Sequence, residues 1–158
     1  MTKPTERFDV RRVERPATLG LRQRVLRPHQ SLADLAAEDA AGPPAVAFAA
    51  LAGDEVVATG SVTEEAPSWA GGPAWRLRAM ASDESYRGTG AGGAVLLGII
   101  DFVAASGGGL LWCHARMPAV GFYRRFGFTT RGEQWDEPFI GPHVMMERLV
   151  EPAGAASS

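Results

Sequence analysis

The sequence predicts an α/β fold in which helices pack on both faces of a mixed, twisted sheet of about seven strands. Apolar runs of strand length alternate with runs at helical spacing, and glycine- and proline-rich breaks separate them. Their order is strand, two helices, three strands, helix, strand, helix and two strands, which is typical of a mixed layered fold. The 158 residues, 46% of them hydrophobic, suit one core, so we predict one domain over residues 1–150 and a disordered tail over 151–158.

The first part of the chain predicts a strand followed by a helix pair. Residues 8–13 have the apolar and β-branched content of a short strand, and residues 15–26 carry leucines and a valine at helical spacing. Pro28 ends that helix because proline cannot continue a helical hydrogen-bond ladder. Ser31 is a suitable cap for a second helix over residues 32–40, which a Gly-Pro-Pro sequence ends.

A β-hairpin and a loop follow. Apolar runs over residues 45–51 and 56–62 flank the turn dipeptide Gly53-Asp54, which is the pattern of two antiparallel strands. Residues 64–73 contain two prolines and two glycines, so we expect a surface loop that could act as a flap over a substrate.

The second half alternates strands and helices. We predict a strand at 75–82, a helix at 90–105 that three glycines end, a strand at 110–115 and a short helix at 118–126. Pro118 suits the start of that helix and Gly127 its end. Two closing strands are expected at 128–135 and 143–149.

Composition excludes several classes of function. Lys plus Arg number 16 against 18 Asp plus Glu, and a net charge of -2 gives no attraction to nucleic acid or to an anionic membrane. Charged residues interrupt the N-terminal segment, and no run approaches the ~20 apolar residues of a membrane span, so we expect a cytoplasmic protein. Cys113 has no second cysteine for a disulfide or a zinc site; we expect it to be buried and expect no metal.

The glycine-rich stretch from Arg87 to Gly93 carries the chemistry. It follows a strand and opens an apolar helix, so backbone N–H groups without helical partners face outward, where the helix dipole favours an anion. A P-loop would need Gly-Lys-Ser/Thr here, and a dinucleotide fold would place an acidic residue after the next strand; the sequence has neither. From the glycines alone, a phosphate site and a plain flexible turn remain equally good interpretations.

At this point the sequence resembles the GNAT superfamily of N-acetyltransferases. Arg87, Gly90 and Gly92 match that family's Arg/Gln-x-x-Gly-x-Gly/Ala motif, which opens the helix after the fourth strand. A second family motif, an alanine followed by an aromatic-tyrosine pair and then Gly-Phe, matches the segment from Ala119 through Tyr123 to Phe128. Several shorter segments resemble a branch of small uncharacterised bacterial GNAT proteins. One departure is Arg116, where many members have asparagine.

The resemblance implies an acetyl-CoA-dependent enzyme in which an amine attacks the thioester directly. Strand backbone would pair with the pantetheine arm and polarise the acetyl carbonyl, and the loop amides would hold the diphosphate. The cofactor-binding residues implied are Met80, Ala81, Ser82, Arg87, Gly88, Thr89, Gly90, Ala91, Gly92, Gly93, Ala119 and Tyr123.

Tyr123 matches the tyrosine that donates a proton to the departing thiolate, and Arg124, Arg125 and the helix N-terminus could polarise its phenol. A simple packing role for Tyr123 is the alternative. The base is open: His143 and Glu133 are our candidates, with His114 and Glu64 also possible, since a histidine or a carboxylate suits the role.

The acceptor would be a primary amine of a small molecule or peptide, and the protein could be a homodimer. Acidic residues could give the acceptor side a negative field or could be an ordinary solvated rim; these are Asp83, Glu84, Glu133, Asp136 and Glu137. Two other functions stay open: a catalytically silent acyl-CoA-binding sensor, and a transferase that uses a longer acyl-CoA.

Overall fold

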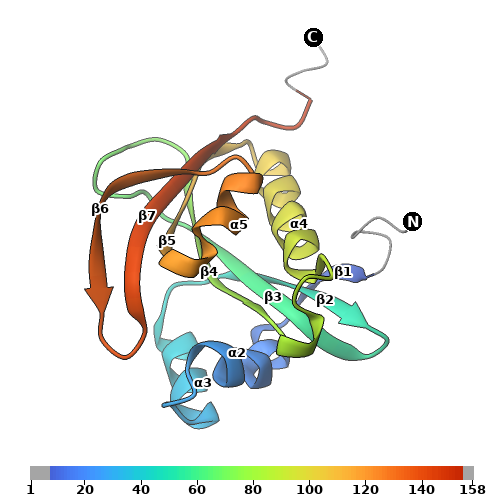
Figure 1. Ribbon diagram of the computed structural model, residues 1–158. Helices are drawn as coiled ribbons and strands as arrows, with labels where there is room; N and C mark the ends of the chain where they lie inside the picture. Colours follow the sequence, from blue (N-terminus) through green and yellow to red (C-terminus); the bar gives the residue numbers. More distant parts are fainter. Residues whose placement is uncertain (1–7, 155–158) are drawn as a thin grey trace. The chain divides into compact units, whose positions relative to one another are not determined.

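The computed structural model describes residues 8–154, which form four α-helices and a seven-stranded mixed sheet (Figure 1). Neighbouring strands pair in the order β1-β2-β3-β4-β5-β7-β6. The strands are β1 (Asp9–Val13), β2 (Val46–Ala52), β3 (Glu55–Glu64), β4 (Ala74–Ser82), β5 (Gly109–Arg116), β6 (Thr129–Glu137) and β7 (Gly141–Val150). The α-helices are α2 (Leu19–Leu26), α3 (Leu32–Ala41), α4 (Ala91–Ala105) and α5 (Val120–Arg125), and short 3-10 helices are η1 (Arg15–Thr18), η2 (Glu84–Tyr86) and η3 (Met117–Ala119).

This element order confirms the predicted fold class, with two local differences. The helices expected at 15–26 and 118–126 both begin as 3-10 turns, η1 and η3, before α2 and α5. Each of these turns has a proline at its first or second position. No hydrogen bond is lost there, because the first N–H groups of a helix have no internal acceptor, and the first turn adopts the tighter 3-10 geometry. No helix among the described residues is long and apolar enough to cross a bilayer.

Two compact units make up the chain, and β4 and α4 each run from one unit into the other. Of the described residues, the first unit contains 8–63 together with 79–101, and the second contains 64–78 together with 102–154. The expectation of a single domain therefore stays a prediction. In the expected disordered tail, 155–158 lie outside the described residues, whereas Ala153 donates its N–H to the Ala104 carbonyl at 2.8 Å.

The first unit is built on an antiparallel sheet that α4 packs against. β2 pairs with both β1 and β3, which confirms the predicted hairpin. Glycines permit close packing: a Cβ added at Gly98 would lie 3.0 Å from Val10 Cγ1, and one at Gly60 would lie 3.0 Å from Ile99 Cδ1. Val57, Val95 and Ile99 are fully buried in this core, which anchors the N-terminal part of α4.

The helix pair α2 and α3 lies side by side in Figure 1 and is joined by ion pairs. Asp39 on α3 accepts from Arg15 Nη2 at 2.8 Å and from Arg22 Nη1 and Nη2 at 3.1 and 2.6 Å. Ser31 caps α3 as predicted: its hydroxyl accepts from the Asp34 N–H at 3.0 Å, and the Asp34 carboxylate accepts in return. These contacts join the two helices.

The second unit is a sheet whose two faces differ in chemistry. β4 pairs with β5 in parallel from Ala74 to Leu77, and β5, β7 and β6 follow as antiparallel neighbours. Because side chains alternate along a strand, one face carries the buried core, whose members are Leu77, Leu111, Cys113, Ala115, Val144, Met146 and Val150. The opposite face carries arginines, histidines and tryptophans.

Candidate active site

The turn that leads into α4 is held rigidly in the first unit. The Asp83 N–H donates to the Val57 carbonyl at 2.8 Å, and the Asp83 carboxylate accepts from the N–H and hydroxyl of Ser85 at 3.0 and 2.7 Å. These hydrogen bonds, with a contribution from Arg24 at 3.1 Å, lower the pKa of Asp83. The acidic residue is therefore occupied in fixing the turn.

The head of α4 presents a run of backbone donors. Arg87 and Thr89 donate their N–H groups within the turn, to Glu84 and Tyr86 at 3.4 and 3.3 Å. The amides without an acceptor in the part of the chain that the structure describes belong to Gly88, Gly90, Ala91, Gly92 and Gly93. The first helical turn has no internal acceptors for its N–H groups, and its dipole adds about half a positive charge.

Glycine is required at two positions of this turn. Gly88 and Gly90 have φ of 79° and 93°, a region that other residues rarely adopt. A Cβ at Gly88 would meet nothing within 4 Å, so its backbone is open to solvent or a ligand. The exposed guanidinium of Arg87 adds a full charge beside the free amides. Donors, dipole and arginine together can bind a diphosphate.

β4 has a backbone irregularity beside the predicted pantetheine-binding residues. Ala79 has φ of 59°, which is unusual for a non-glycine residue within a strand. Ala81 and the partly buried Met80 and Ser82 follow directly. A non-glycine residue at positive φ re-aims the strand after it, and such residues are concentrated at functional sites.

Tyr123 is buried on α5 in the second unit. Its side chain is 7% exposed, and its ring contacts those of Phe122 and Phe128 at centroid distances of 5.2 and 5.4 Å. Burial raises the pKa of Tyr123 well above its usual value, Cys113 adds to the rise and Arg116 opposes it. The phenol is therefore protonated across the physiological pH range, as an acid must be before it reacts.

The positive charge that acts on Tyr123 differs from the one we expected. Arg124 and Arg125 are both exposed in the last turn of α5, and Arg125 lies over the Phe122 ring at 5.9 Å. Arg116, the residue that departs from the family motif, is the charge that favours the ionised phenol. A cation at the end of β5 therefore opposes the raised pKa of Tyr123, and a role for Arg124, Arg125 or the helix N-terminus stays a prediction.

The two histidines of this unit have opposite hydrogen-bond patterns. His143 is buried, and its Nδ1 lies 2.9 Å from the Gly141 carbonyl, which can only accept. Nδ1 therefore carries the proton, and in the neutral ring Nε2 has a free lone pair. His114 accepts at Nδ1 from Arg76 Nη2 at 3.1 Å, and burial, followed by the charge of Arg76, lowers its pKa to about 4. His143 is thus the better base.

The other predicted acidic residues are spread over the chain. Asp83 and Glu84 belong to the first unit, whereas Glu64, Glu133, Asp136 and Glu137 belong to the second. Glu133 and Glu64 are exposed, and Glu137 accepts from Trp135 Nε1 at 2.9 Å. Ala119 precedes the first residue of α5 and is partly exposed.

Apart from His114, a candidate base, sequence reasoning missed the residues on the face of this sheet opposite the core. Trp112 and His114 lie two positions apart on β5, and Arg76 and Arg78 lie two positions apart on β4, so each pair shares one face of the sheet. Trp69 belongs to the loop before β4. The alternation of charged or aromatic residues with buried ones in both strands was the signal that could have identified them. Burial raises the pKa of Cys113 to about 12, so that thiol is inert.

Comparison with known proteins identifies the class of enzyme. A sequence model of the acetyltransferase (GNAT) family matches residues 10–128. The chain is 30% identical over 144 residues to YitI, an uncharacterized N-acetyltransferase of Bacillus subtilis (strain 168), covering 90% of this chain and 97% of that one.

Solved structures show the same fold. An N-acetyltransferase structure from Lactobacillus plantarum, described as putative, has a TM-score of 0.74 at 19% identity and covers 90% of this chain and 98% of that one. An aminoglycoside 6'-N-acetyltransferase complexed with coenzyme A has a TM-score of 0.72 at 15% identity, with 91% and 98% covered. The chain belongs to the acetyltransferase (GNAT) family and is an acetyltransferase.

Proposed function

We propose that the protein transfers an acetyl group from acetyl-CoA to a primary amine of a small molecule or peptide. The observation that carries this proposal is the run of unpartnered amides at the head of α4, flanked by Arg87, in a chain of this family. Amides at a helix N-terminus suit a diphosphate because they supply donors without a competing negative charge.

The cofactor contacts divide between backbone and side chain. In this proposal the diphosphate binds the segment from Arg87 to Gly93, and the backbone of Met80, Ala81 and Ser82 pairs with the pantetheine arm. The positive φ of Ala79 supports this second assignment, because it re-aims the strand just before those residues. Ala119 and Tyr123 would contact the thioester end from α5.

Two side chains would manage the protons of the reaction. The amine nitrogen forms a bond to the acetyl carbon while the carbon–sulfur bond breaks, so the amine loses a proton and the thiolate gains one. We assign the donor to Tyr123, whose raised pKa keeps it protonated. We propose that His143 Nε2 takes the proton from the amine, directly or through a water molecule, in preference to the exposed Glu133.

Thermal unfolding with and without acetyl-CoA tests the diphosphate site. Acetyl-CoA should raise the Tm of the wild type, and Gly92→Glu should abolish the rise because it places a carboxylate among the phosphate-binding amides. Gly20→Glu is the matched control, since Gly20 is likewise the second residue of a helix in the same unit and a Cβ there meets only Arg24 at 3.7 Å. An equal rise in Gly92→Glu and the wild type would refute the site.

A further inference from the structure

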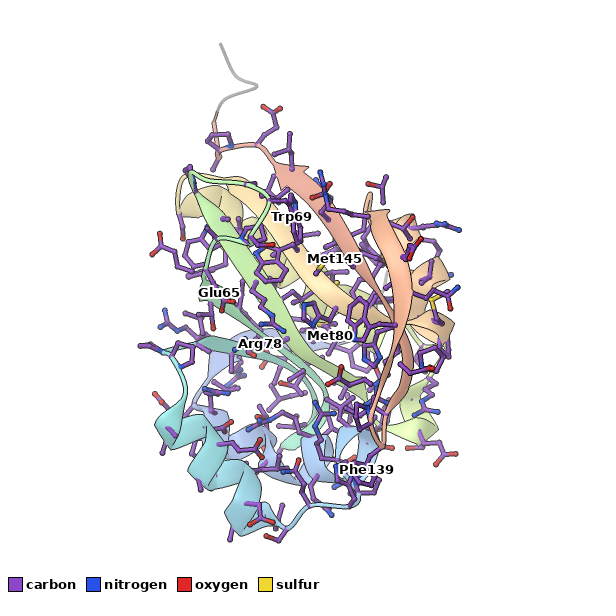
Figure 2. The ribbon with its side chains drawn as sticks, turned by 90° about the vertical axis from the view of Figure 1, so that its left-hand side faces the viewer. Glu65, Trp69, Arg78, Met80, Phe139 and Met145 are labelled. Atoms are coloured by element: carbon purple, nitrogen blue, oxygen red, sulfur yellow. The ribbon has the colours of Figure 1, made fainter. Side chains whose placement is uncertain are left out.

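One face of the second unit's sheet carries a cluster of which the reaction just proposed uses only His143. We call it the polar face, and its members are Trp69, Arg76, Arg78, Trp112, His114, Arg131, Trp135, His143 and Glu147. Register places its members together: Arg76 is paired with Trp112, Trp112 with Glu147, and His143 with Trp135. Paired residues of neighbouring strands lie on the same side of a sheet. In Figure 2 its labelled members Trp69 and Arg78 and their neighbours Glu65 and Met145 lie on the side toward the viewer.

Aromatic rings form a continuous path across the polar face. Trp69 meets Trp112 edge to face at a centroid distance of 5.6 Å, and Trp112 meets His114 at 5.8 Å. His114 then meets Trp135 at 5.1 Å, and Trp135 meets His143 at 5.7 Å. The path connects the arginine end of the face with the histidine that we assign as the base.

The indole N–H groups of the polar face donate hydrogen bonds to the glutamates around it. Trp69 Nε1 and Arg131 Nε both donate to Glu147 at 3.0 Å. Trp135 donates to Glu137, as described above, and Trp112 Nε1 donates to the Glu65 carbonyl at 2.9 Å. A ligand amine would therefore have to compete with internal donors for these carboxylates, which argues against an acidic cage for a cation.

Arg76 is the exception, because its charge is poorly matched. Its Nε is the one buried side-chain nitrogen or oxygen among the described residues that has no hydrogen-bond partner. Nη2 donates to the neutral His114, and Nη1 lies 3.5 Å from Glu65 Oε2, beyond good hydrogen-bond distance. Arg78 Nη2 lies at the same 3.5 Å from the other oxygen of Glu65, so one carboxylate serves two guanidinium groups.

This mismatch is costly in a protein that binds nothing there. A half-buried guanidinium without a close anion retains much of its desolvation cost, and burial followed by the charge of Arg78 lowers the pKa of Arg76 accordingly. The Arg76 guanidinium also lies over the Trp112 ring at 5.0 Å, which fixes its orientation. What Arg76 lacks is an anion at good hydrogen-bonding distance, because the Glu65 carboxylate lies 3.5 Å away.

We infer that Arg76, with Arg78 beside it, binds the carboxylate of the acceptor, and that the acceptor is an amino acid or another amine bearing a carboxylate. The inference rests on the proposed function, because it names the acceptor class of that reaction. A guanidinium binds a carboxylate through paired N–H···O contacts, and the tryptophan and histidine rings give an apolar surface for the rest of the molecule. Glu65 has to turn aside from Arg76 as the ligand enters, and it is partly exposed.

A matched pair of acceptors tests this directly: phenylalanine and phenylalaninamide, which differ only in the carboxylate. The wild type should show a KM about 10- to 100-fold lower for phenylalanine, the range expected from charged hydrogen bonds. The amine of the amide is less basic and more often neutral, so reactivity alone would favour the amide. A preference for the carboxylate must then come from binding.

Two variants locate the preference. Arg76→Gln should reduce the KM ratio to about 1 while kcat changes little, because the contact is the same in the ground and transition states. Arg131→Gln is the control, since Arg131 lies on the same face but already donates to Glu147. It should leave the ratio intact. A wild type that prefers the amide or treats both alike overturns the inference, as does a ratio that survives in a folded Arg76→Gln protein.

Failure of this inference can be distinguished from failure of the proposed function. If the protein responds to acetyl-CoA in thermal unfolding but shows no preference for the carboxylate, the proposed function stands and the proposed acceptor class is refuted. If neither amine is acetylated, calorimetry with N-acetylphenylalanine and its carboxamide decides the point without turnover. Tighter binding of the carboxylate that depends on Arg76 supports the inference, and equal or absent binding of both overturns it.

Discussion

Replacing Tyr123 by phenylalanine separates chemistry from packing. The ring of Tyr123 packs against Phe122 and Phe128, and these contacts do not need the hydroxyl oxygen. Removing the hydroxyl keeps this packing, so the free energy of unfolding should change by less than about 1 kcal/mol. Truncation to alanine, by contrast, should cost about 3 to 5 kcal/mol, as for other buried aromatic side chains.

The catalytic effect should be much larger than the effect on stability. A positioned general acid contributes about 10²- to 10⁴-fold to a rate, which corresponds to about 2.7 to 5.4 kcal/mol of activation free energy. We therefore expect Tyr123→Phe to lower kcat by that factor with acetyl-CoA affinity nearly unchanged. The assay is thiol release for kcat, calorimetry for affinity and denaturant unfolding for stability. A kcat within about threefold of wild type would refute the acid role, and a parallel loss of stability would indicate packing instead.

Three further predictions concern stability. His114 has a folded pKa of about 4, below its unfolded value near 6.5. The folding stability that depends on the neutral imidazole is therefore fully present above pH 6.5 and is lost as the pH falls toward 4. His114→Asn, which keeps an acceptor for Arg76, should make urea midpoints fall less over that window; an unchanged fall would contradict the assignment. Asp39→Ala strands the buried Arg22 and should cost about 2 to 4 kcal/mol in denaturant unfolding without altering kcat, and a cost under about 0.5 would contradict this. Ser31→Ala should cost about 1 kcal/mol by the same measurement, whereas Ser31→Asp should restore stability if capping is the cause.

Local sequence rules were sufficient for most of the fold. The cap at Ser31, the Gly53-Asp54 hairpin and the glycine-rich turn at Gly88 each depend on one or two residues with a specific conformational preference. The boundaries of these elements follow from local chemistry, so one sequence was enough to place them. The proline-led 3-10 turns were missed because proline permits both kinds of helix start.

The candidate site was harder to predict because it depends on contacts between distant residues. Arg76 and His114 are 38 positions apart and meet only because β4 and β5 run parallel with a particular register. The tautomer of His143 likewise depends on a carbonyl contact that no sequence pattern announces. The positive φ of Ala79 had no signal at all, since alanine rarely adopts it.

The same reasoning applies to the charges near Tyr123. Arg124 and Arg125 were natural candidates for polarising Tyr123 because they adjoin it in sequence, but side chains one and two positions apart on a helix point in different directions. The charge that acts on the phenol comes from Arg116, seven positions earlier. Arg116, the departure noted in the sequence, is therefore able to ease ionisation of a buried phenol.

Calorimetric titration of the wild type and of Gly92→Glu with coenzyme A and with pantetheine, which lacks the diphosphate together with the 3'-phosphoadenosine, tests the central claim most directly, because only the diphosphate contact should be lost in the variant. If the amides at the head of α4 bind the diphosphate, coenzyme A should bind at least about 100-fold more tightly, from several charge-assisted hydrogen bonds lost together. Binding of the two compounds with equal affinity, or no binding of coenzyme A, would contradict the account.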